Sequence, residues 1–167
     1  MIRNATENDA EAIASIYNHY ISNTVITFEE ELVAAPDIAQ RIKAIQTAGL
    51  PWLVAEENNT LIGYAYASPW HYRSAYQFSV ETSVYLDPKS VGKGWGIKLY
   101  HSLFLALEKT NIHTIISGIA LPNPASIALH EKFGMIKTAH FNEVGYKLNQ
   151  WVDVGYWQLN LASGKDE

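Results

Sequence analysis

The stretch Val-Gly-Lys-Gly-Trp-Gly-Ile at residues 91–97 places three alternating glycines between a strand pattern and a helix pattern. A long strand is predicted from residue 76 to 86, and hydrophobic side chains at 97, 100, 104 and 107 then recur at helical spacing. Glycine lets the backbone approach a ligand closely, and the free N–H groups and positive dipole at a helix start favour a phosphate. No acidic residue lies between Pro88 and Tyr100, and the turn is flanked by Lys89, Lys93 and Lys98. We therefore expect a pyrophosphate-bearing ligand at this turn.

Two other phosphate motifs do not fit this stretch. The Walker motif requires Lys and Ser or Thr after its last glycines, whereas Trp95 follows Gly94 here. The dinucleotide motif is G-x-G-x-x-G, whereas the glycines here are spaced G-x-G-x-G. Nucleoside triphosphates and NAD are therefore poor candidates, and a tight turn without any ligand is the remaining alternative.

Working outward from the glycine turn, helix and strand patterns alternate along the chain. They predict one α/β domain over residues 1–167, with a mixed sheet of about seven strands and helices on both faces. The expected strands are residues 2–5, 52–56, 61–68, 76–86, 114–120, 135–144 and 153–161, and the expected helices are residues 10–22, 36–48, 94–109 and 124–133.

Composition excludes several classes of function. The formal net charge is −5 without any basic run, which argues against nucleic acid as a partner. There is no long apolar stretch and no signal-peptide pattern, so we expect a cytoplasmic protein without a membrane partner. The absence of cysteine excludes disulfides, zinc–thiolate sites and a cysteine acyl-enzyme. The six histidines lack any spacing such as H-E-x-x-H, so no metal site is expected.

The glycine stretch resembles the pyrophosphate loop of the GCN5-related N-acetyltransferase (GNAT) superfamily, which reads Q/R-x-x-G-x-G/A. Residues 91–96 match it, except that Val91 stands where the family has Gln or Arg. Residues 121–126 and 129–134 are similar to the family's second coenzyme-contacting helix. The resemblance implies a GNAT-type, largely antiparallel sheet and acetyl-CoA as co-substrate. The implied coenzyme contacts are Gly92, Lys93, Gly94, Trp95, Gly96, Ile97, Asn123 and Ser126.

Within the superfamily, the chain is most similar to phosphinothricin N-acetyltransferases and to relatives that act on methionine sulfone or sulfoximine. The similarity covers nearly the whole chain and rests on residues 16–21, 51–56, 80–85, 145–147 and 151–158. It implies direct attack of a small-molecule primary amine on acetyl-CoA, and a homodimer. Two alternatives remain open, namely a protein or peptide N-acetyltransferase and a non-catalytic sensor module that binds coenzyme A.

An amine must lose a proton before it attacks a thioester, and Glu81 is the candidate general base. It lies in the strand before the glycine turn and matches the family's base, although strict alternation also allows a solvated polar strand face. Backbone N–H groups of residues Val84, Tyr85 and Leu86 are candidates to stabilise the oxyanion and to pair with pantetheine. His130 stands where the family has a Tyr that protonates the leaving thiolate, and a packed structural histidine is the alternative.

An amino-acid-like acceptor needs a fixed cation and aromatic walls. Arg73 and Tyr76 match the acceptor loop of phosphinothricin-type enzymes, whereas sulfone-type relatives tend to carry Arg two positions earlier, where this chain has His71. The resemblance also places Phe28, Thr82, Tyr146 and Lys147 near the acceptor. A surface role for Arg73 and a core role for Phe28 are the alternatives.

Overall fold

The computed structural model describes residues 1–162 and contains one seven-stranded sheet with the order β1-β2-β3-β4-β5-β7-β6. Within the described residues, β4 and β5 are the only parallel neighbours, and every other adjacent pair is antiparallel. The mixed, largely antiparallel sheet is therefore confirmed. The strands are β1 (Ile2–Asn4), β2 (Trp52–Glu57), β3 (Thr60–Pro69), β4 (Ser79–Leu86), β5 (Thr114–Leu121), β6 (Ile136–Lys147) and β7 (Gln150–Asn160).

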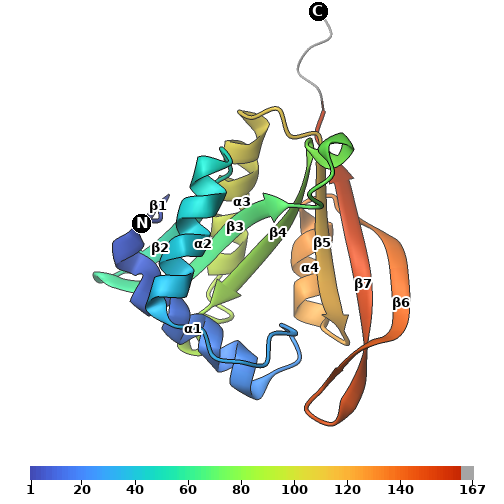
Figure 1. Cartoon of the computed structure of the whole chain (residues 1–167), viewed down its shortest axis with the longest axis horizontal. Helices are drawn as coiled ribbons and strands as arrows, with labels where there is room; N and C mark the ends of the chain where they lie inside the picture. Colours follow the sequence, from blue (N-terminus) through green and yellow to red (C-terminus); the bar gives the residue numbers. More distant parts are fainter. Residues whose placement is uncertain (163–167) are drawn as a thin grey trace, which may run out of the picture.

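Helices cover both faces of the sheet, as expected (Figure 1). One face carries α1 (Ala10–Asn23) and α2 (Ala35–Thr47), and the other carries α3 (Trp95–Glu108) and α4 (Pro124–Lys132). Short 3₁₀ turns occur at Glu7–Asp9, Ser74–Tyr76 and Pro88–Ser90. No helix within residues 1–162 is long and apolar enough to cross a membrane.

The hydrophobic core fills both spaces between helices and sheet. Ile13 and Ile42 are fully buried under the first helix pair, and Leu103 and Ile115 are fully buried under the second. Between α1 and the sheet, Tyr17 and Tyr20 of α1 pack against Tyr85 of β4 with ring centroids 5.2 and 5.3 Å apart. These contacts fix α1 directly over the end of β4.

The start of β4 differs from the sequence expectation. The strand was predicted from residue 76, but Ser74–Tyr76 form a 3₁₀ turn in which Tyr76 N–H donates to Arg73 O at 2.9 Å. Pairing with β3 begins where Trp70 N–H donates to Ser79 O at 3.2 Å. The local turn hydrogen bonds therefore delay the strand by three residues.

The last hairpin is longer than expected. The prediction ended one strand at residue 144 and began the next at 153, whereas β6 runs to Lys147 and β7 starts at Gln150. The two-residue turn uses Leu148 and Asn149 at φ values of 52° and 59°. Type I′ turns need positive φ at both central residues, which usually calls for Asn and Gly. Leu148 gives no such signal in the sequence.

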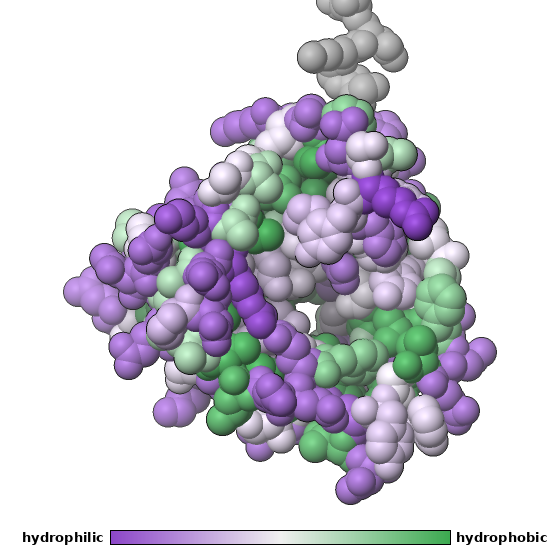
Figure 2. Space-filling model, in the orientation of Figure 1, coloured by the Kyte–Doolittle hydropathy of each residue, from purple (hydrophilic) through white to green (hydrophobic). Residues whose placement is uncertain are grey.

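Strands β4 and β5 separate soon after they begin. Their pairing consists of Ser79 with Thr114, Val80 with Ile115 and Glu81 with Ile116, after which β5 continues to pair only with β7. From Thr82 to Leu86 one side of β4 therefore has no strand partner. Figure 2 shows an opening through the molecule near its centre, in the region of this gap.

Candidate active site

The gap between β4 and β5 presents backbone groups of β4. Asp87 N–H donates to Ile62 O at 2.8 Å and Ser79 O accepts from Trp70, so the odd-numbered residues of β4 direct their backbone groups toward β3. Backbone groups alternate along a strand, so the N–H groups of Val84 and Leu86 face the gap. Tyr85 N–H faces β3 instead, which removes one of the three backbone donors expected from the sequence.

The glycine turn forms one end of a groove that continues from this gap. Gly92 and Gly94 have φ values of 79° and 80°, a conformation that glycine adopts without strain. Gly94 precedes α3, whose first N–H groups have no partner within the helix. The groove holds about 410 Å³ and is lined by the end of β4, by the glycine turn and by α4. Its predicted members are Val84, Tyr85, Leu86, Gly92, Gly94, Gly96, Ile97, Asn123 and Ser126.

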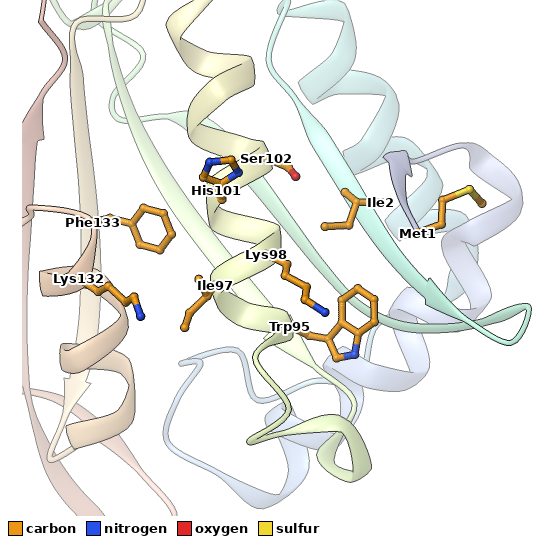
Figure 3. Close-up of a pocket in the computed structure, with 9 residues that line it drawn as sticks. All are labelled: Met1, Ile2, Trp95, Ile97, Lys98, His101, Ser102, Lys132 and Phe133. Carbon is orange, nitrogen blue, oxygen red and sulfur yellow. The ribbon is translucent and has the colours of Figure 1, made fainter.

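Lys93 and Trp95 do not line this groove. The indole ring of Trp95 faces the outer side of α3, where Lys98 Nζ lies 4.3 Å from its centroid. Trp95 and Lys98 also line a separate hollow of about 660 Å³ between the chain start, α3 and α4. Figure 3 shows this hollow, with Lys98 and His101 on α3 and Lys132 on α4. It shares Ile97 and Lys132 with the groove and lies away from Glu81.

Asn123 and Ser126 start α4 at the other side of the groove. Asn123 Oδ1 accepts from Ser126 N–H at 3.2 Å, which is a helix N-cap. Both residues also line a cavity of about 60 Å³ in the gap, together with Val84 and Gly118. The start of α4 therefore faces the backbone donors of β4 across the gap.

Glu81 lies at the last pair before β4 and β5 separate. It shares a sheet face with Tyr85, which packs against α1, because the two residues are four positions apart on one strand. Its carboxylate forms no hydrogen bond or ion pair with any residue between 1 and 162. Burial raises its pKa above the ordinary 4.5, and the nearby His71 partly offsets this shift. The carboxylate lies next to Gly118 of β5, because a Cβ atom there would be 3.5 Å from Glu81 Oε1. A partly buried carboxylate without a partner has the properties of a general base.

His130 lies on the opposite sheet face and is 4% exposed. Its Nδ1 lies 2.6 Å from Ser126 O, and this carbonyl can only accept, so Nδ1 is the donor. In the neutral ring Nε2 then accepts from the Tyr100 hydroxyl at 2.9 Å. Burial lowers the pKa of His130 from its ordinary value, which favours this neutral form. Both ring nitrogens are thus occupied by protein partners.

Thr82 belongs to this second face and not to the Glu81 face. Its hydroxyl lies 2.6 Å from Ser117 Oγ and its side chain is buried. Strand alternation separates it from its neighbour Glu81. Thr82 therefore points away from the face of the sheet that carries Glu81, where the acceptor is expected.

Phe28 and Lys147 come together on the Glu81 side of the sheet. The ring of Phe28 covers Gly145, because a Cβ atom at Gly145 would lie 2.4 Å from it. Lys147 is 3% exposed and donates to Thr27 O at 2.7 Å. These contacts attach residues 24–34, between α1 and α2, to the β6–β7 hairpin. A polar network holds the same segment, since Glu29 pairs with Arg41 and accepts from the Tyr17 hydroxyl.

Three expected acceptor residues lie elsewhere. Arg73 lines a separate hollow of about 410 Å³ with Gly49 and Thr110, near the ends of α2 and α3. Tyr76 is partly exposed, and its ring contacts His71 with centroids 5.0 Å apart. Tyr146 is 55% exposed and packs on Trp151. Lys147 is thus a buried cation on the Glu81 side of the sheet, whereas Arg73 lines the separate hollow.

Sequence reasoning missed an aromatic wall beside Glu81. Tyr156 of β7 pairs with Gly118 and lies on the same sheet face as Glu81. Trp70 and Phe141 contact Tyr156 edge-on, with centroids 5.6 and 5.8 Å away. Residues 151–158 carried part of the family resemblance, but only the register of β5 with β7 brings this ring to Glu81. Among the described residues, no group of three His, Asp or Glu side chains is placed to hold a metal ion.

Comparisons with known proteins agree with this geometry. The acetyltransferase (GNAT) domain family matches residues 2–155. Phosphinothricin N-acetyltransferase from Streptomyces viridochromogenes is 36% identical over 96% of this chain and 87% of its own. An L-methionine sulfoximine/L-methionine sulfone acetyltransferase from Salmonella typhimurium is also 36% identical, over 96% and 94%. A phosphinothricin acetyltransferase from Sinorhizobium meliloti, solved in complex with acetyl-CoA, superposes with a TM-score of 0.95 at 35% identity, covering 99% of this chain and 90% of the other. The chain belongs to the GNAT acetyltransferase family and is an N-acetyltransferase.

Proposed function

We propose that this enzyme transfers the acetyl group of acetyl-CoA to the primary amine of a small amino-acid analogue such as phosphinothricin. One observation carries the proposal: Glu81, a partly buried carboxylate without a partner, borders the β4–β5 gap from which the 410 Å³ groove continues. Relatives named for phosphinothricin and for methionine sulfoximine support an amino-acid-like acceptor.

The groove residues fit acetyl-CoA. The glycine turn offers backbone N–H groups and a helix start to a pyrophosphate, and these contacts need no side chain at Val91, which is 56% exposed. Val84 and Leu86 offer backbone N–H groups to the pantetheine and to the acetyl oxygen, and Asn123 and Ser126 line the opposite wall. Bound acetyl-CoA supplies the acetyl group as an activated thioester.

Glu81 acts on the amine from the other face of the sheet. The acceptor ammonium gives one proton to Glu81, and its nitrogen lone pair then forms the bond to the acetyl carbon while the C–S bond breaks. The second nitrogen proton ends on the sulfur as the thiol, and Glu81 releases its proton to solvent. The raised pKa of Glu81 brings its basicity closer to that of the amine, which favours proton transfer.

On the sulfur side, we propose that His130 positions α4 and does not donate the proton. Its two nitrogens are hydrogen-bonded to Ser126 O and to the Tyr100 hydroxyl, and burial lowers its pKa, which favours the neutral ring. Replacing His130 with Asn should preserve the shape of the pH–rate profile while raising KM for acetyl-CoA. If His130 were the general acid, its replacement with Asn would instead remove one limb of the pH–rate profile.

For the acceptor's acidic groups, we propose Lys147 as the recognition cation, with Phe28 and the Tyr156 wall enclosing the apolar part. Arg73, the cation expected to bind a phosphinate, lines a separate hollow, and this position makes methionine sulfone or sulfoximine the second candidate. Replacing Lys147 with Met should raise KM for an acidic acceptor far more than for its amide.

The deciding experiment measures acetyl-CoA-dependent thiol release with phosphinothricin, methionine sulfone, methionine sulfoximine and a short peptide. Saturable turnover of one of the three amino acids supports the proposal. Turnover of the peptide alone favours a protein N-acetyltransferase, and binding of acetyl-CoA without turnover of any amine favours a sensor module.

We also propose that residues 1–167 act as one domain in the cytoplasm, as a homodimer. Exposed apolar side chains gather on the β6–β7 hairpin, where Phe141, Tyr146 and Trp151 are more than half exposed. Light scattering coupled to gel filtration tests the dimer, and a monomer at micromolar concentration would contradict it.

A further inference from the structure

The small cavity in the β4–β5 gap, of about 60 Å³, has an inner wall made by Thr82, Tyr100 and His130. The Tyr100 hydroxyl lies 2.9 Å from His130 Nε2 and 3.4 Å from Thr82 Oγ1. None of the three residues is more than 4% exposed. A buried polar group that loses its partner is costly, so this wall retreats only if buried hydrogen bonds break. The depth of the cavity is therefore fixed.

The opposite wall of the cavity includes Ile26, which belongs to a different part of the fold. Within residues 1–162, Ile26 is the only residue lining this cavity that lies outside the sheet, α3 and α4 with its N-cap. It comes from the segment between α1 and α2, where its backbone N–H donates to Thr24 Oγ1 at 3.2 Å. Its side chain is 44% exposed. Ile26 is therefore a wall that can be changed without opening the core.

Ile26 also stands where the cavity joins the 410 Å³ groove. The two spaces share five lining residues, which are Ile26, Val84, Tyr85, Asn123 and Ser126. A donor that lies in the groove and reaches into the gap must therefore pass Ile26. Its reacting end then lies between Ile26 and the fixed inner wall.

An acetyl group fills a space of this size. A water molecule takes about 30 Å³ in the liquid, so a cavity of about 60 Å³ admits about two groups of that size. The carbonyl oxygen and the methyl group of an acetyl group are two such groups. Each added methylene of a longer acyl chain then needs space that only a movement of Ile26 provides, because the inner wall is fixed and the groove holds the rest of the donor.

We propose that this cavity selects the acyl donor by chain length, and that Ile26 is the specificity residue that limits the acyl group to two carbons. The inference rests on the proposed transfer to a small amine. Propanoyl or butanoyl transfer would follow the same balance, in which the N–C bond forms, the C–S bond breaks and the thiol leaves. The limit is therefore one of space and not of reactivity.

The first experiment compares acetyl-CoA, propanoyl-CoA and butanoyl-CoA as donors in thiol-release assays, with phosphinothricin or L-methionine sulfone as the saturating acceptor. One methylene that a pocket does not accommodate changes kcat/KM by about 10–200-fold. We expect kcat/KM for the donor to fall by at least about tenfold from acetyl-CoA to propanoyl-CoA, and further for butanoyl-CoA. Equal values for acetyl-CoA and butanoyl-CoA would overturn the limit.

The second experiment assigns the limit to Ile26. Ile26→Ala shortens the wall by three carbon atoms, so the ratio of kcat/KM for butanoyl-CoA to that for acetyl-CoA should rise by about tenfold or more. A ratio is unaffected by a loss of active protein, and melting temperatures check the fold. Leu32→Ala is the matched control, because Leu32 lies on the same segment, is 66% exposed and lines neither the cavity nor the groove. The control should keep the ratio of the unmodified enzyme, and the same ratio in Ile26→Ala would remove Ile26 from donor selection.

Calorimetric titration with acetyl-CoA and butanoyl-CoA, without any acceptor, separates this inference from the proposed function. We expect butanoyl-CoA to bind the unmodified enzyme more weakly than acetyl-CoA does, and the difference to shrink in Ile26→Ala. Equal dissociation constants in the unmodified enzyme would overturn the size limit even if acetyl transfer to a small amine is observed. If no small amine is acetylated, the proposed function fails, and the titration still decides whether the cavity selects the acyl group.

Discussion

Replacing Glu81 with Gln should lower turnover and at the same time stabilise the folded protein at neutral pH. Both effects come from one structural cause, namely a carboxylate that is partly withdrawn from water and has no hydrogen-bond partner within residues 1–162. Gln keeps the shape of the side chain but neither accepts a proton nor carries a charge. Loss of a general base typically lowers the rate by about 10²–10⁴-fold.

The stability change follows from the direction of the pKa shift. Burial raises the folded-state pKa of Glu81 above its unfolded value. The folded state therefore favours the protonated form, and this contribution is complete below the unfolded pKa and is lost as the pH rises through the folded pKa. Near neutral pH the carboxylate is ionised at a cost of about 1.4 kcal/mol for each unit of upward shift. Glu81→Gln removes that cost.

Two assays on the same proteins give a quantitative check. The low-pH limb of kcat/KM for the acceptor reports the pKa of Glu81 in the free enzyme. Urea unfolding of both proteins, at about pH 4 and about pH 8, gives the difference in unfolding free energy. The stabilisation at the higher pH should equal about 1.4 kcal/mol times the shift read from the rate profile. Glu57→Gln, at an exposed position of the β2–β3 hairpin, is the control and should change neither quantity.

Two results would refute this reasoning. Wild-type kcat/KM across the pH range in Glu81→Gln would remove Glu81 from the proton transfer. A Gln variant that is less stable than the wild type at the higher pH would show that Glu81 gains more from its surroundings than it loses by burial.

Three other substitutions test separate parts of the molecule. The added methyl group of Gly94→Ala would meet no atom within 4 Å, so the substitution acts through the backbone strain of an L-residue at φ 80°. Urea unfolding should show a loss of roughly 1–2 kcal/mol, and initial-rate assays should show a higher KM for acetyl-CoA. An unchanged KM would contradict the proposed pyrophosphate site at the glycine turn. Gly145→Ala places a methyl group 2.4 Å from the Phe28 ring, so the ring must move. The substitution should raise KM for the acceptor and lower the free energy of unfolding by about 1–3 kcal/mol. Unchanged acceptor kinetics would show that Phe28 is not part of the acceptor site. Arg3→Met leaves Asp9, which is 8% exposed, without its ion pair, so urea unfolding should show a loss of about 1–3 kcal/mol near neutral pH. Because Arg3 lowers the pKa of Asp9, that loss should shrink as the pH falls below 3.8, and a constant difference would argue against the ion pair as its cause.

Local signals explain what could be predicted from the sequence. The helix expected at residues 94–109 is α3, Trp95–Glu108, because the glycines before it and the apolar period within it are both properties of neighbouring residues. The same holds for the groove, since the glycine turn and the α4 start are contiguous stretches whose place in the fold follows from the strands beside them.

The acceptor side was harder because it depends on strand parity and register. Thr82 is adjacent to Glu81 and Tyr146 is adjacent to Lys147, but alternation sends each neighbour to the other face of the sheet. Parity within one strand was readable from the sequence and would have excluded Thr82. The contact between Gly118 and Tyr156 could not be read from the sequence, because it follows from the pairing of two strands whose residues lie 38 positions apart.

In the proposed function, the separation of β4 from β5 lets two substrates meet without competing for the same surface. Odd-numbered side chains of β4 lie on the Glu81 face, and even-numbered ones face the Tyr100–His130 cluster. The backbone N–H groups of Val84 and Leu86 belong to neither face and lie in the gap itself. In the proposed function, a thioester in the groove reaches an amine on the other face through the gap, so that the reacting atoms meet at the level of the sheet. Closing the gap by continued β4–β5 pairing would occupy those N–H groups and separate the two sites. The loss of strand pairing after Glu81 is a feature of the fold that the proposed reaction requires.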